Sequence, residues 1–384
     1  MLRMTRRLRM SEDINIVHCA ISEVGKCLKE LSSGVEGVTA ADHLPGQGAK
    51  RREAEGTPST PTRQLFIVCD RNVRNLAEKI GIEADGIFEI DATEANKDIS
   101  TVVGINRWLM DQGADRNALL LGIGGGITTD ITGFSASVYK RGIRFSFVPT
   151  TLLSQVDAAI GGKNGVNLDS YKNMIGVIRQ PDAVFICPEP LDTLPYTQIV
   201  SGASELLKTF IIDNSKGLYD KSVEILSGIR KAGGNISGYS STLNSLIAEA
   251  ALVKAGIAGR DPFEKGERRL LNLGHTFAHS IEKLSGEGIS HGEAVSMGII
   301  LAARLAEKVG LAEKGLEDRF KADFTACGMS VDCPYAVKDL TGAMSKDKKA
   351  EGSIVHFILP SEVGYVCVKD MSPSEATRLL QEQK

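Results

Sequence analysis

The feature that most constrains the fold is an alternation, in the first half of the chain, of short apolar runs with helical patterns. Leu65–Asp70 (LFIVCD) precedes a helical pattern, and Ala118–Gly126 (ALLLGIGGG) precedes a helix that we predict over Asp130–Lys140. Arg144–Thr151 and Ala183–Pro188 are two further runs of this kind. Apolar runs without polar alternation are typical of strands that are buried on both faces. We therefore predict a parallel sheet with helices on both sides.

The second half has a different pattern, because β-branched runs almost vanish after about residue 192. Five ranges have helical patterns: Val200–Ile212, Leu243–Gly259, Gly274–Ser285, His291–Val309 and Leu316–Cys327. Ser353–Pro360 and Gly364–Val368 predict a late hairpin, and the capping-box spacing of Ser372 and Glu375 predicts a terminal helix. At 384 residues the chain exceeds the usual size of one hydrophobic core. We predict an α/β domain over residues 1–190 and a mainly helical domain over residues 191–384.

The N-terminal region contains two segments without a regular pattern. The first ten residues, MLRMTRRLRM, include four arginines and no acid, and no apolar run of signal-peptide length follows them. We interpret them as an irregular, solvated leader. Ile14–Leu31 has the pattern of a strand and then of an amphipathic helix. Residues 34–63 are rich in Gly, Pro, Thr and charge, which predicts an exposed loop insertion.

The composition excludes several classes of protein. With 42% hydrophobic residues, 24% charged residues and a formal net charge of −3, the chain is an ordinary globular protein without a positive field for nucleic acid or anionic lipid. No stretch of 18 uncharged apolar residues predicts a membrane span. The seven cysteines are an odd number without CxxC spacing, as expected of buried thiols in a reducing compartment. We therefore predict a cytoplasmic protein with no nucleic-acid or membrane partner.

A glycine-rich run, Gly122–Asp130 (GIGGGITTD), joins a predicted strand to a predicted helix. Bare backbone N–H groups and a helix N-terminus suit the binding of a diphosphate. The run is not the GxGxxG fingerprint of dinucleotide-binding folds, because Ile127 stands where the third glycine is needed. It therefore indicates a nucleotide site, and the alternative is a tight turn that needs glycine for positive φ.

Three of the six histidines fall within 17 positions of the helical half. His275 and His279 are one helical turn apart, His291 begins the next helical pattern, and Glu205 precedes them on SGASELLK. Imidazole and carboxylate groups from facing helices suit Zn²⁺ and its neighbours in the first transition row. Spacing alone favours His275 and His279 as ligands. The remaining histidines are interpreted as hydrogen-bonded core residues: His18, His43 and His356.

Basic residues alternate with glycines in two segments that we predict to be a loop region, Val156–Asn167 and Tyr171–Gly176. These segments and other cations could line a basic pocket for a phosphate or a carboxylate. The alternative for each side chain is a solvated surface charge. The residues concerned are Asp157, Lys163, Lys172, Asn173, Arg141, Lys208, Lys254, Arg268 and the segment Asp347–Lys349.

Together these motifs resemble one known family. GGGITTDITGF, YKRGIRF, VPTTLLSQVDAAIGGKNGVN, KNMIG, SGASELLK, LNLGHTFAHSIE and SHGEAVSMG occur in this order between about residues 65 and 364. They are similar to the motifs of the 3-dehydroquinate synthases, a family of sugar-phosphate cyclases. The resemblance implies a Rossmann-like NAD-binding α/β domain, a mostly helical metal-binding domain, an active site between them, and a homodimer.

The resemblance also implies roles for single residues. Glu205, His275 and His291 would bind one divalent metal, zinc or cobalt, in place of the pair that spacing favours. Phosphate binding and proton transfer would fall to His279, Lys163, Asn173, Asn272 and, from a neighbouring subunit, Arg141. The substrate carboxylate would face Lys254, Arg268 and either Lys348 or Lys349. NAD would contact Asp70, Asn72, Glu94, Lys97, Gly125, Gly126, Asp130, Thr150, Thr151, Asp157, Lys172 and Thr193.

Three departures from the family pattern affect no charged or metal-ligating side chain. Asn164 replaces the threonine of the usual GGKT, Ala92 and Thr93 replace the usual Pro-Gly before Glu94, and Ser204 replaces the usual alanine before Glu205. These departures bear only on the details of how the chain would contact the nucleotide.

The activity that the resemblance implies is that of a phosphate-eliminating lyase of the shikimate pathway, which leads to chorismate and the aromatic amino acids. It converts 3-deoxy-D-arabino-heptulosonate 7-phosphate into 3-dehydroquinate and phosphate by transient oxidation with NAD, phosphate elimination, re-reduction and intramolecular aldol cyclisation. The alternatives are another sugar-phosphate cyclase, a metal-dependent polyol dehydrogenase that releases NADH, and a non-catalytic NAD-binding protein.

Overall fold

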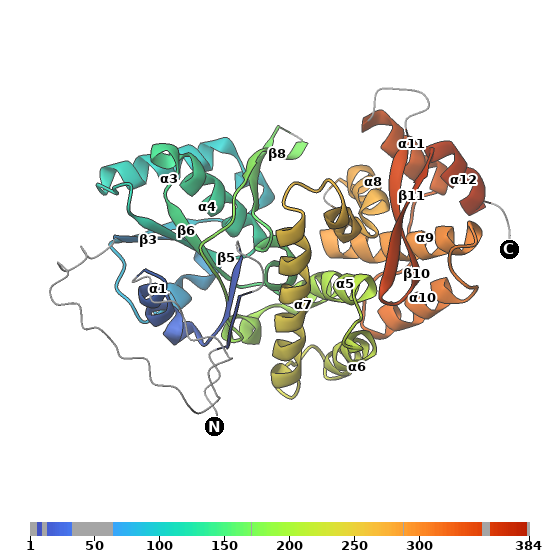
Figure 1. The fold of residues 1–384 in the computed structure, drawn as a ribbon, viewed down its shortest axis with the longest axis horizontal. Coiled ribbons are helices and arrows are strands. Elements are labelled where there is room, and N and C mark those ends of the chain that lie inside the picture. The colour runs from blue at the N-terminus through green and yellow to red at the C-terminus, as the bar shows by residue number, and fades with distance from the viewer. Residues whose placement is uncertain are drawn as a thin grey trace, which may run out of the picture.

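The structure is a computed structural model that describes residues 6–9, 14–32, 64–169, 171–286, 288–347 and 354–381. The predicted loop over residues 34–63, His43, Lys348 and Lys349 lie outside the described residues. Figure 1 shows a half built on a sheet and a half built mainly of helices, with the long helix α7 (Ser240–Arg260) between them.

A seven-stranded sheet forms the first half of the described chain. The strands lie in the order β1-β2-β9-β6-β5-β3-β4, and all except β1 run parallel. β1 pairs antiparallel with the outer side of β2, so the prediction of an irregular leader is wrong for residues 6–9. Pairing supplies partners for backbone groups that an edge strand would leave open. The bounds are β1 Arg6–Arg9, β2 Asn15–His18, β3 Leu65–Asp70, β4 Gly86–Ile90, β5 Leu119–Gly124, β6 Arg144–Pro149 and β9 Val184–Ile186.

Side-chain alternation along the strands fills a core on each face of the sheet. In β3, Phe66 and Val68 belong to one core, and Leu65, Ile67 and Cys69 belong to the other. Because successive side chains of a strand point to opposite faces, a continuous apolar run is required when both faces are covered. The helices α3 (Ile99–Asp111) and α4 (Gly126–Val138) cover the first face, and α1 (Val24–Ser32) and α2 (Arg74–Ala77) cover the second. The predicted parallel sheet with helices on both sides is confirmed.

The segment that we predicted as a loop between residues 156 and 176 is partly a hairpin. A π-helical turn, Ser154–Ala158, leads into the antiparallel strands β7 (Lys163–Leu168) and β8 (Tyr171–Ile178). Glycine misled the prediction, because here it permits close approach of the two strands. A Cβ atom on Gly165 would lie 2.7 Å from the carbonyl oxygen of Ile175. Glycine therefore marks tight packing of a strand pair as well as a turn.

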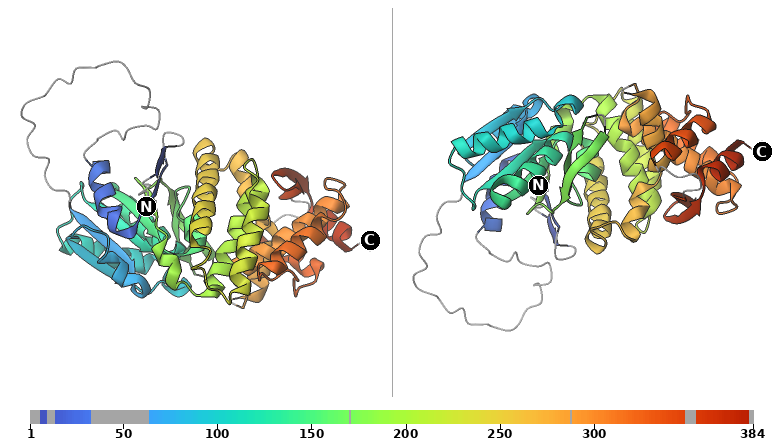
Figure 2. Two further views of the ribbon diagram at one scale, coloured as in Figure 1. Left: turned by 90° about the horizontal axis from the view of Figure 1, so that it is seen from below. Right: turned by 90° about the horizontal axis from the view of Figure 1, so that it is seen from above.

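The second half contains helices and one further hairpin, as Figure 2 shows from two directions. The five predicted helical ranges, the late hairpin and the terminal helix are confirmed, and α6 and α11 are additional. Of the helices in the described ranges, none pairs the necessary length with enough apolar residues to span a bilayer. The bounds are α5 Tyr196–Ile212, α6 Leu218–Lys231, α8 His275–Ser285, α9 His291–Lys308, α10 Leu316–Ala326, α11 Val337–Asp347, β10 Val355–Glu362, β11 Tyr365–Met371 and α12 Pro373–Gln381.

Helix α5 lies at the centre of the helical half. Its residues 202–212 are buried without interruption, and it packs against α6, α7 and α9. A helix that is apolar around its whole circumference occupies a core, so any charged side chain on it needs a partner. Glu205 and Lys208 are such side chains, with 0% and 1% exposure. The most buried charges of this half are thereby placed beside the histidine helices.

Candidate active site

The glycine run that joins β5 to α4 is shaped by close packing. None of Gly122, Gly124, Gly125 and Gly126 has positive φ, so the interpretation of these glycines as a positive-φ turn is wrong. A Cβ atom on Gly124 would instead lie 2.3 Å from the Thr128 hydroxyl oxygen. Strand and helix can approach only because the glycines lack side chains. The start of α4 therefore packs directly against the end of β5.

Most of the predicted nucleotide contacts lie where neighbouring parallel strands end. Asp70 is the last residue of β3, Glu94 follows β4, Gly125 follows β5, and Thr150 follows β6. These four strands are adjacent in the sheet. Ligands of open α/β sheets bind in the crevice outside the carboxyl ends of the strands. The topology thus gathers these residues at one edge.

A buried ion pair lies beside the glycine run. Lys97 Nζ is 2.6 Å from Asp130 Oδ2 and donates a second hydrogen bond, 2.7 Å long, to Asn173 Oδ1. Asn173 has φ of 55° on the β7–β8 hairpin, and its backbone N–H donates to Asn167. Burial raises the pKa of Asp130 to about 6, although Lys97 opposes the shift. The pair therefore links α4, the segment after β4 and the hairpin.

Glu205, His275 and His291 meet in one cluster in the helical half. Glu205 Oε1 lies 3.6 Å from His275 Nε2 and 3.5 Å from His291 Nε2. Local signals position both imidazoles: His275 begins α8 after Gly274, which has φ of 79°, and His291 begins α9 after the N-cap Ser290. The sequence folds both residues to helix N-termini that face α5.

Glu205 and His275 have the protonation states that metal ligands need. Burial would raise the pKa of Glu205, but Lys208, His291 and His275 hold it well below its ordinary value. Burial, with Lys208 and the other imidazoles, lowers the pKa of His275 to about 3. Burial would also lower the pKa of His291, but Glu205 and Glu282 raise it to about 9. The cluster combines an ionised carboxylate with one neutral imidazole.

These residues fit a divalent metal ion. Their ligand atoms all lie within 4.8 Å of one another, and the Oε1 atom of the buried Glu205 carboxylate, which faces both imidazoles, has no hydrogen-bond donor among the described residues, whereas Oε2 is ion-paired with Lys208. Two imidazoles and one carboxylate form a frequent ligand set for catalytic zinc and leave a coordination position open. His279, which spacing favoured as a ligand, is outside this set, and its ring centroid lies 5.6 Å from that of His275.

Two lysines converge on Asp157 between the two halves. Lys254, on α7, is ion-paired with the Asp157 carboxylate and donates to its carbonyl oxygen at 2.7 Å. Lys208 Nζ lies 3.8 Å from Asp157 Oδ1 and is also ion-paired with Glu205. Burial would raise the pKa of Asp157, but the two lysines lower it. Asp157 therefore connects the turn before the hairpin, through Lys208, to Glu205 of the metal-type cluster, by which we mean Glu205, His275 and His291.

A second group of polar residues lines a cavity of about 510 Å³ beside α8. Glu264 accepts from both Lys163 Nζ and Asn272 Nδ2, and His275 and His279 line the same cavity. Glu264 has left-handed φ of 56°. Burial would raise its pKa, but the two donors lower it. The Glu264 carboxylate thus binds the two donors, Lys163 and Asn272, that would suit an incoming anion. No motif or periodic pattern in the sequence indicated Glu264.

Glu282 also contacts the cluster, and it is not among the site residues that we predicted from the sequence. Its Oε1 atom lies 3.5 Å from His291 Nδ1 and 3.1 Å from Lys172 Nζ. Burial would raise its pKa, but His291 and Lys172 lower it to about 2. The available signal was its position seven residues after His275, which places both side chains on one face of α8.

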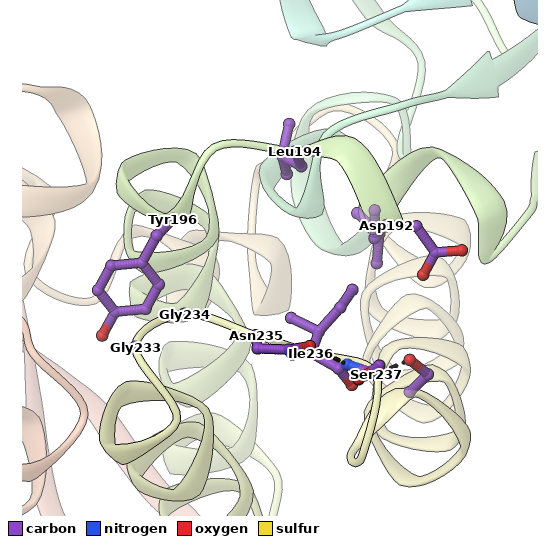
Figure 3. A pocket seen from close by; sticks show the side chains of 10 residues that line it. Asp192, Leu194, Tyr196, Gly233, Gly234, Asn235, Ile236 and Ser237 are labelled. Atoms are coloured by element: carbon purple, nitrogen blue, oxygen red, sulfur yellow. Dashed lines mark hydrogen bonds between the residues drawn. The ribbon is translucent and has the colours of Figure 1, made fainter.

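Figure 3 shows a different hollow, of about 690 Å³, between the start of α5 and the loop before α7. Asp192, Tyr196 and Ile236 line it together with Gly233 and Gly234. None of the histidines or lysines discussed above lines this hollow. The chemistry that the sequence predicts therefore belongs to the cluster on α5, α8 and α9.

Comparisons with known proteins assign the chain to a family. The family descriptions "3-dehydroquinate synthase N-terminal" and "3-dehydroquinate synthase C-terminal" match residues 87–201 and 202–350. The chain belongs to the 3-dehydroquinate synthase family. It is 42% identical to a 3-dehydroquinate synthase of Pyrococcus abyssi over 72% of this chain and 79% of that protein. The corresponding protein of Dictyoglomus thermophilum is 37% identical over 75% and 80%.

A solved structure shares the fold of this 3-dehydroquinate synthase family member. The 2-epi-5-epi-valiolone synthase of Streptomyces hygroscopicus subsp. jinggangensis 5008, with NAD⁺ and Zn²⁺ bound, is 25% identical. It aligns over 87% of this chain and 98% of its own, with a TM-score of 0.72. The predicted Rossmann-like sheet followed by a mostly helical half is therefore the fold of a sugar-phosphate cyclase.

Several other residues that the 3-dehydroquinate synthase motifs single out are exposed, and Arg268 has contacts of its own. Arg141 is exposed in the turn after α4 with φ of 69°, and Asn72, Glu94 and Thr193 are exposed too. Arg268 is buried, and its guanidinium donates to the carbonyl oxygens of Pro262 and Gly161. The structure therefore gathers the metal-type ligands more closely than the substrate-carboxylate residues.

The two remaining histidines of the described chain differ from our interpretation. His356 is exposed and lies 2.5 Å from Asp370 on the neighbouring strand, so it is a surface residue of the β10–β11 hairpin. His18 is half-buried on β2, and its Nε2 atom has no hydrogen-bond partner among the described residues. Burial lowers its pKa, so the neutral form is favoured. Neither is a hydrogen-bonded core histidine.

Proposed function

We propose that this protein is a 3-dehydroquinate synthase, which converts 3-deoxy-D-arabino-heptulosonate 7-phosphate into 3-dehydroquinate and phosphate. The observation that carries the proposal is the Glu205, His275 and His291 cluster, beside a cavity with the anion donors Lys163 and Asn272. The reaction needs both features close together, because an alcohol must be oxidised next to the carbon–hydrogen bond that is lost with phosphate.

Two groups would complete the site. NAD would bind at the carboxyl ends of β4, β3, β5 and β6, and zinc or cobalt would bind at Glu205, His275 and His291. When bound, NAD⁺ accepts and returns a hydride, and the divalent ion acts as a Lewis acid toward the substrate's alcohol and ketone oxygens. The NAD-bound and zinc-bound relative of similar fold supports this assignment.

The chain's own residues would bind and orient the substrate. Lys163, Asn173 and Asn272 would hold the phosphate, whose oxygens can take the neighbouring proton when elimination begins. His279 would assist that proton movement, because it lines the same cavity as Lys163. Lys254 and Arg268 would face the substrate carboxylate, and Lys348 or Lys349 would join them.

The decisive experiment is incubation of the purified protein with the heptulosonate phosphate, NAD⁺ and Zn²⁺ or Co²⁺, followed by identification of the product. We expect 3-dehydroquinate and one equivalent of phosphate, with no net NADH. Accumulation of NADH would identify a polyol dehydrogenase instead. Turnover of a phosphorylated sugar without a carboxylate, and none of the heptulosonate, would identify another sugar-phosphate cyclase.

Self-association is part of the proposal. The β7–β8 hairpin exposes large apolar side chains, and Val138 at the end of α4 is exposed as well; those on the hairpin are Leu168, Tyr171, Met174 and Ile178. A second copy of the chain would cover them and bring Arg141 to the partner's phosphate site. We expect a homodimer by sedimentation.

The division of the chain and its compartment complete the proposal. A boundary near residue 190 would separate an NAD domain from a metal and substrate domain. All seven cysteines are free thiols, and five of them are buried. This pattern supports a reducing compartment such as the cytoplasm.

A further inference from the structure

Glu282 stands between the metal-type cluster and the sheet half of the molecule. Its side chain is only 12% exposed, yet two positively charged or hydrogen-donating groups approach the same carboxylate oxygen. His291 Nδ1, on α9, lies 3.5 Å from Oε1. Lys172 Nζ, on the β7–β8 hairpin, lies 3.1 Å from it. A buried carboxylate in such a position has a structural task.

The two imidazoles of the cluster are arranged alike. In each, Nε2 faces Glu205 Oε1, and Nδ1 faces an oxygen atom on the other side of the ring. That oxygen is the Leu273 carbonyl, 3.2 Å away, for His275, and the Glu282 carboxylate for His291. A hydrogen-bond acceptor at the second nitrogen fixes the tautomer and the ring orientation of a metal-ligating histidine.

We infer that Glu282 is a positioning residue of the divalent-metal centre: it accepts the Nδ1 hydrogen of His291 and so directs Nε2 toward Glu205. The inference rests on the proposed metal site. The exposed side chain of Lys172 steadies the carboxylate from the sheet half, but the metal affinity depends on the contact with His291. Carboxylate partners of this kind contribute about 10–100-fold to metal affinity.

The test measures metal binding directly, on the full chain stripped of metal and titrated with Co²⁺, by the visible absorption of the bound ion. We expect Glu282→Ala to bind Co²⁺ about 10–100-fold more weakly than the parent. Glu282→Gln keeps a carbonyl acceptor for His291, so we expect it to restore part of the loss. The Gln variant also serves if the Ala variant does not fold. An unchanged affinity and Co²⁺ spectrum in both variants would overturn the inference.

Three controls separate the inference from its foundation. Glu249→Gln removes the carboxylate of another Lys–Glu pair, Lys216–Glu249, in which the lysine is also exposed and the glutamate is less exposed. We expect this variant to bind Co²⁺ with the affinity of the parent. Lys172→Ala removes the ion pair but leaves His291 its acceptor, so a loss equal to that of Glu282→Ala would overturn the role through His291. His275→Ala tests the metal site: if it binds Co²⁺ as the parent does, the proposed centre is wrong, whatever Glu282 does.

Discussion

The Lys208 ammonium is ion-paired with the Glu205 carboxylate one turn earlier on α5, and both side chains are almost fully buried. Burial would lower the pKa of Lys208, but Glu205 and Asp157 raise it. The carboxylate of the metal-type cluster is therefore kept ionised by a cation of its own helix. A pair of this kind stabilises the fold only while both partners are present.

Replacing Lys208 by methionine should lower the stability of the metal-free protein. The substitution keeps most of the side-chain length and removes the nearest cation of the buried Glu205 carboxylate, and breaking a buried pair in this way typically costs about 3–5 kcal/mol of unfolding free energy. Urea unfolding of the metal-free chain measures the change. Lys216→Met is the control, because Lys216 is 62% exposed and its pair should contribute less than about 1 kcal/mol. Equal stability of the Lys208 variant and the parent would contradict the prediction.

Removal of the Lys163 ammonium should weaken phosphate binding. Lys163 is one of the two donors at the Glu264 carboxylate, and its loss removes the charge that would hold a phosphate dianion. We expect inorganic phosphate to inhibit Lys163→Ala at least about 10-fold less effectively, since a hydrogen bond to a charged group contributes ~1.5–3 kcal/mol. Competition between phosphate and substrate measures this. Unchanged competition would count against Lys163 as a phosphate ligand.

Glu264→Gln should have the opposite effect on phosphate. Glu264 occupies the donors Lys163 and Asn272 and repels an incoming anion, so a neutral amide should let phosphate bind roughly 10-fold more tightly, the equivalent of one charge-assisted hydrogen bond. Isothermal titration with phosphate gives the affinity. Glu267→Gln is the control, because this nearby carboxylate is paired with Arg260 instead. Weaker phosphate binding by Glu264→Gln would show that the carboxylate helps to build the site.

The elements that could be predicted from the sequence are those whose signal is local. Most residues of β3 and β6 are buried, and the apolar runs Leu65–Asp70 and Arg144–Thr151 predicted these two strands. β4 escaped notice because Gly86–Ile90 is half exposed and carries Glu89. Helix α6 escaped because its apolar stripe is narrow among many polar residues. Periodicity detects burial, so elements near the surface are harder to detect.

The candidate site depended more on long-range packing. Spacing favoured His275 with His279, because residues four apart share a helix face. The carboxylate that meets His275 in the structure is that of Glu205 on α5, which lies 70 positions earlier in the chain. Residue types made Glu205 a candidate, but only the resemblance to a family joined it with His275 and His291 in one ligand set. Glu264 lies outside the helices and strands, so no periodic pattern includes it, and its backbone has a left-handed φ of 56°. Contacts between distant segments are not encoded in local spacing.

His279→Ala should reduce turnover. His279 lines the cavity with Lys163 and Asn272, where a general acid or base contributes about 10²–10⁴-fold to the rate. We expect kcat to fall within that range while KM changes little, as measured by phosphate release. His356→Ala is the control, because His356 lines the same cavity but is paired with Asp370 at the surface. A full turnover rate in the His279 variant with normal substrate affinity would exclude the role.

The Asp130 carboxyl group should make stability depend on pH in the direction opposite to most carboxylates. Burial raises its pKa to about 6 from 3.8, so between these values the folded chain binds more protons than the unfolded chain. The contribution of this group to the free energy of unfolding is fully present below about pH 4 and is lost as the pH rises through about 6. The loss is at most about 3 kcal/mol, because each pKa unit corresponds to ~1.4 kcal/mol.

Asp130→Asn removes this titration, so the variant should gain stability relative to the parent as the pH rises from 4 to 7. Unfolding free energies at half-unit intervals measure the difference. Asp98→Asn is the matched control, because the backbone N–H of Thr101 lowers the pKa of Asp98 at the start of α3. The stability from Asp98 is therefore already complete above pH 5, and its variant should show no such gain. A flat difference between the Asp130 variant and the parent would mean that Lys97 compensates fully for the burial of this carboxylate.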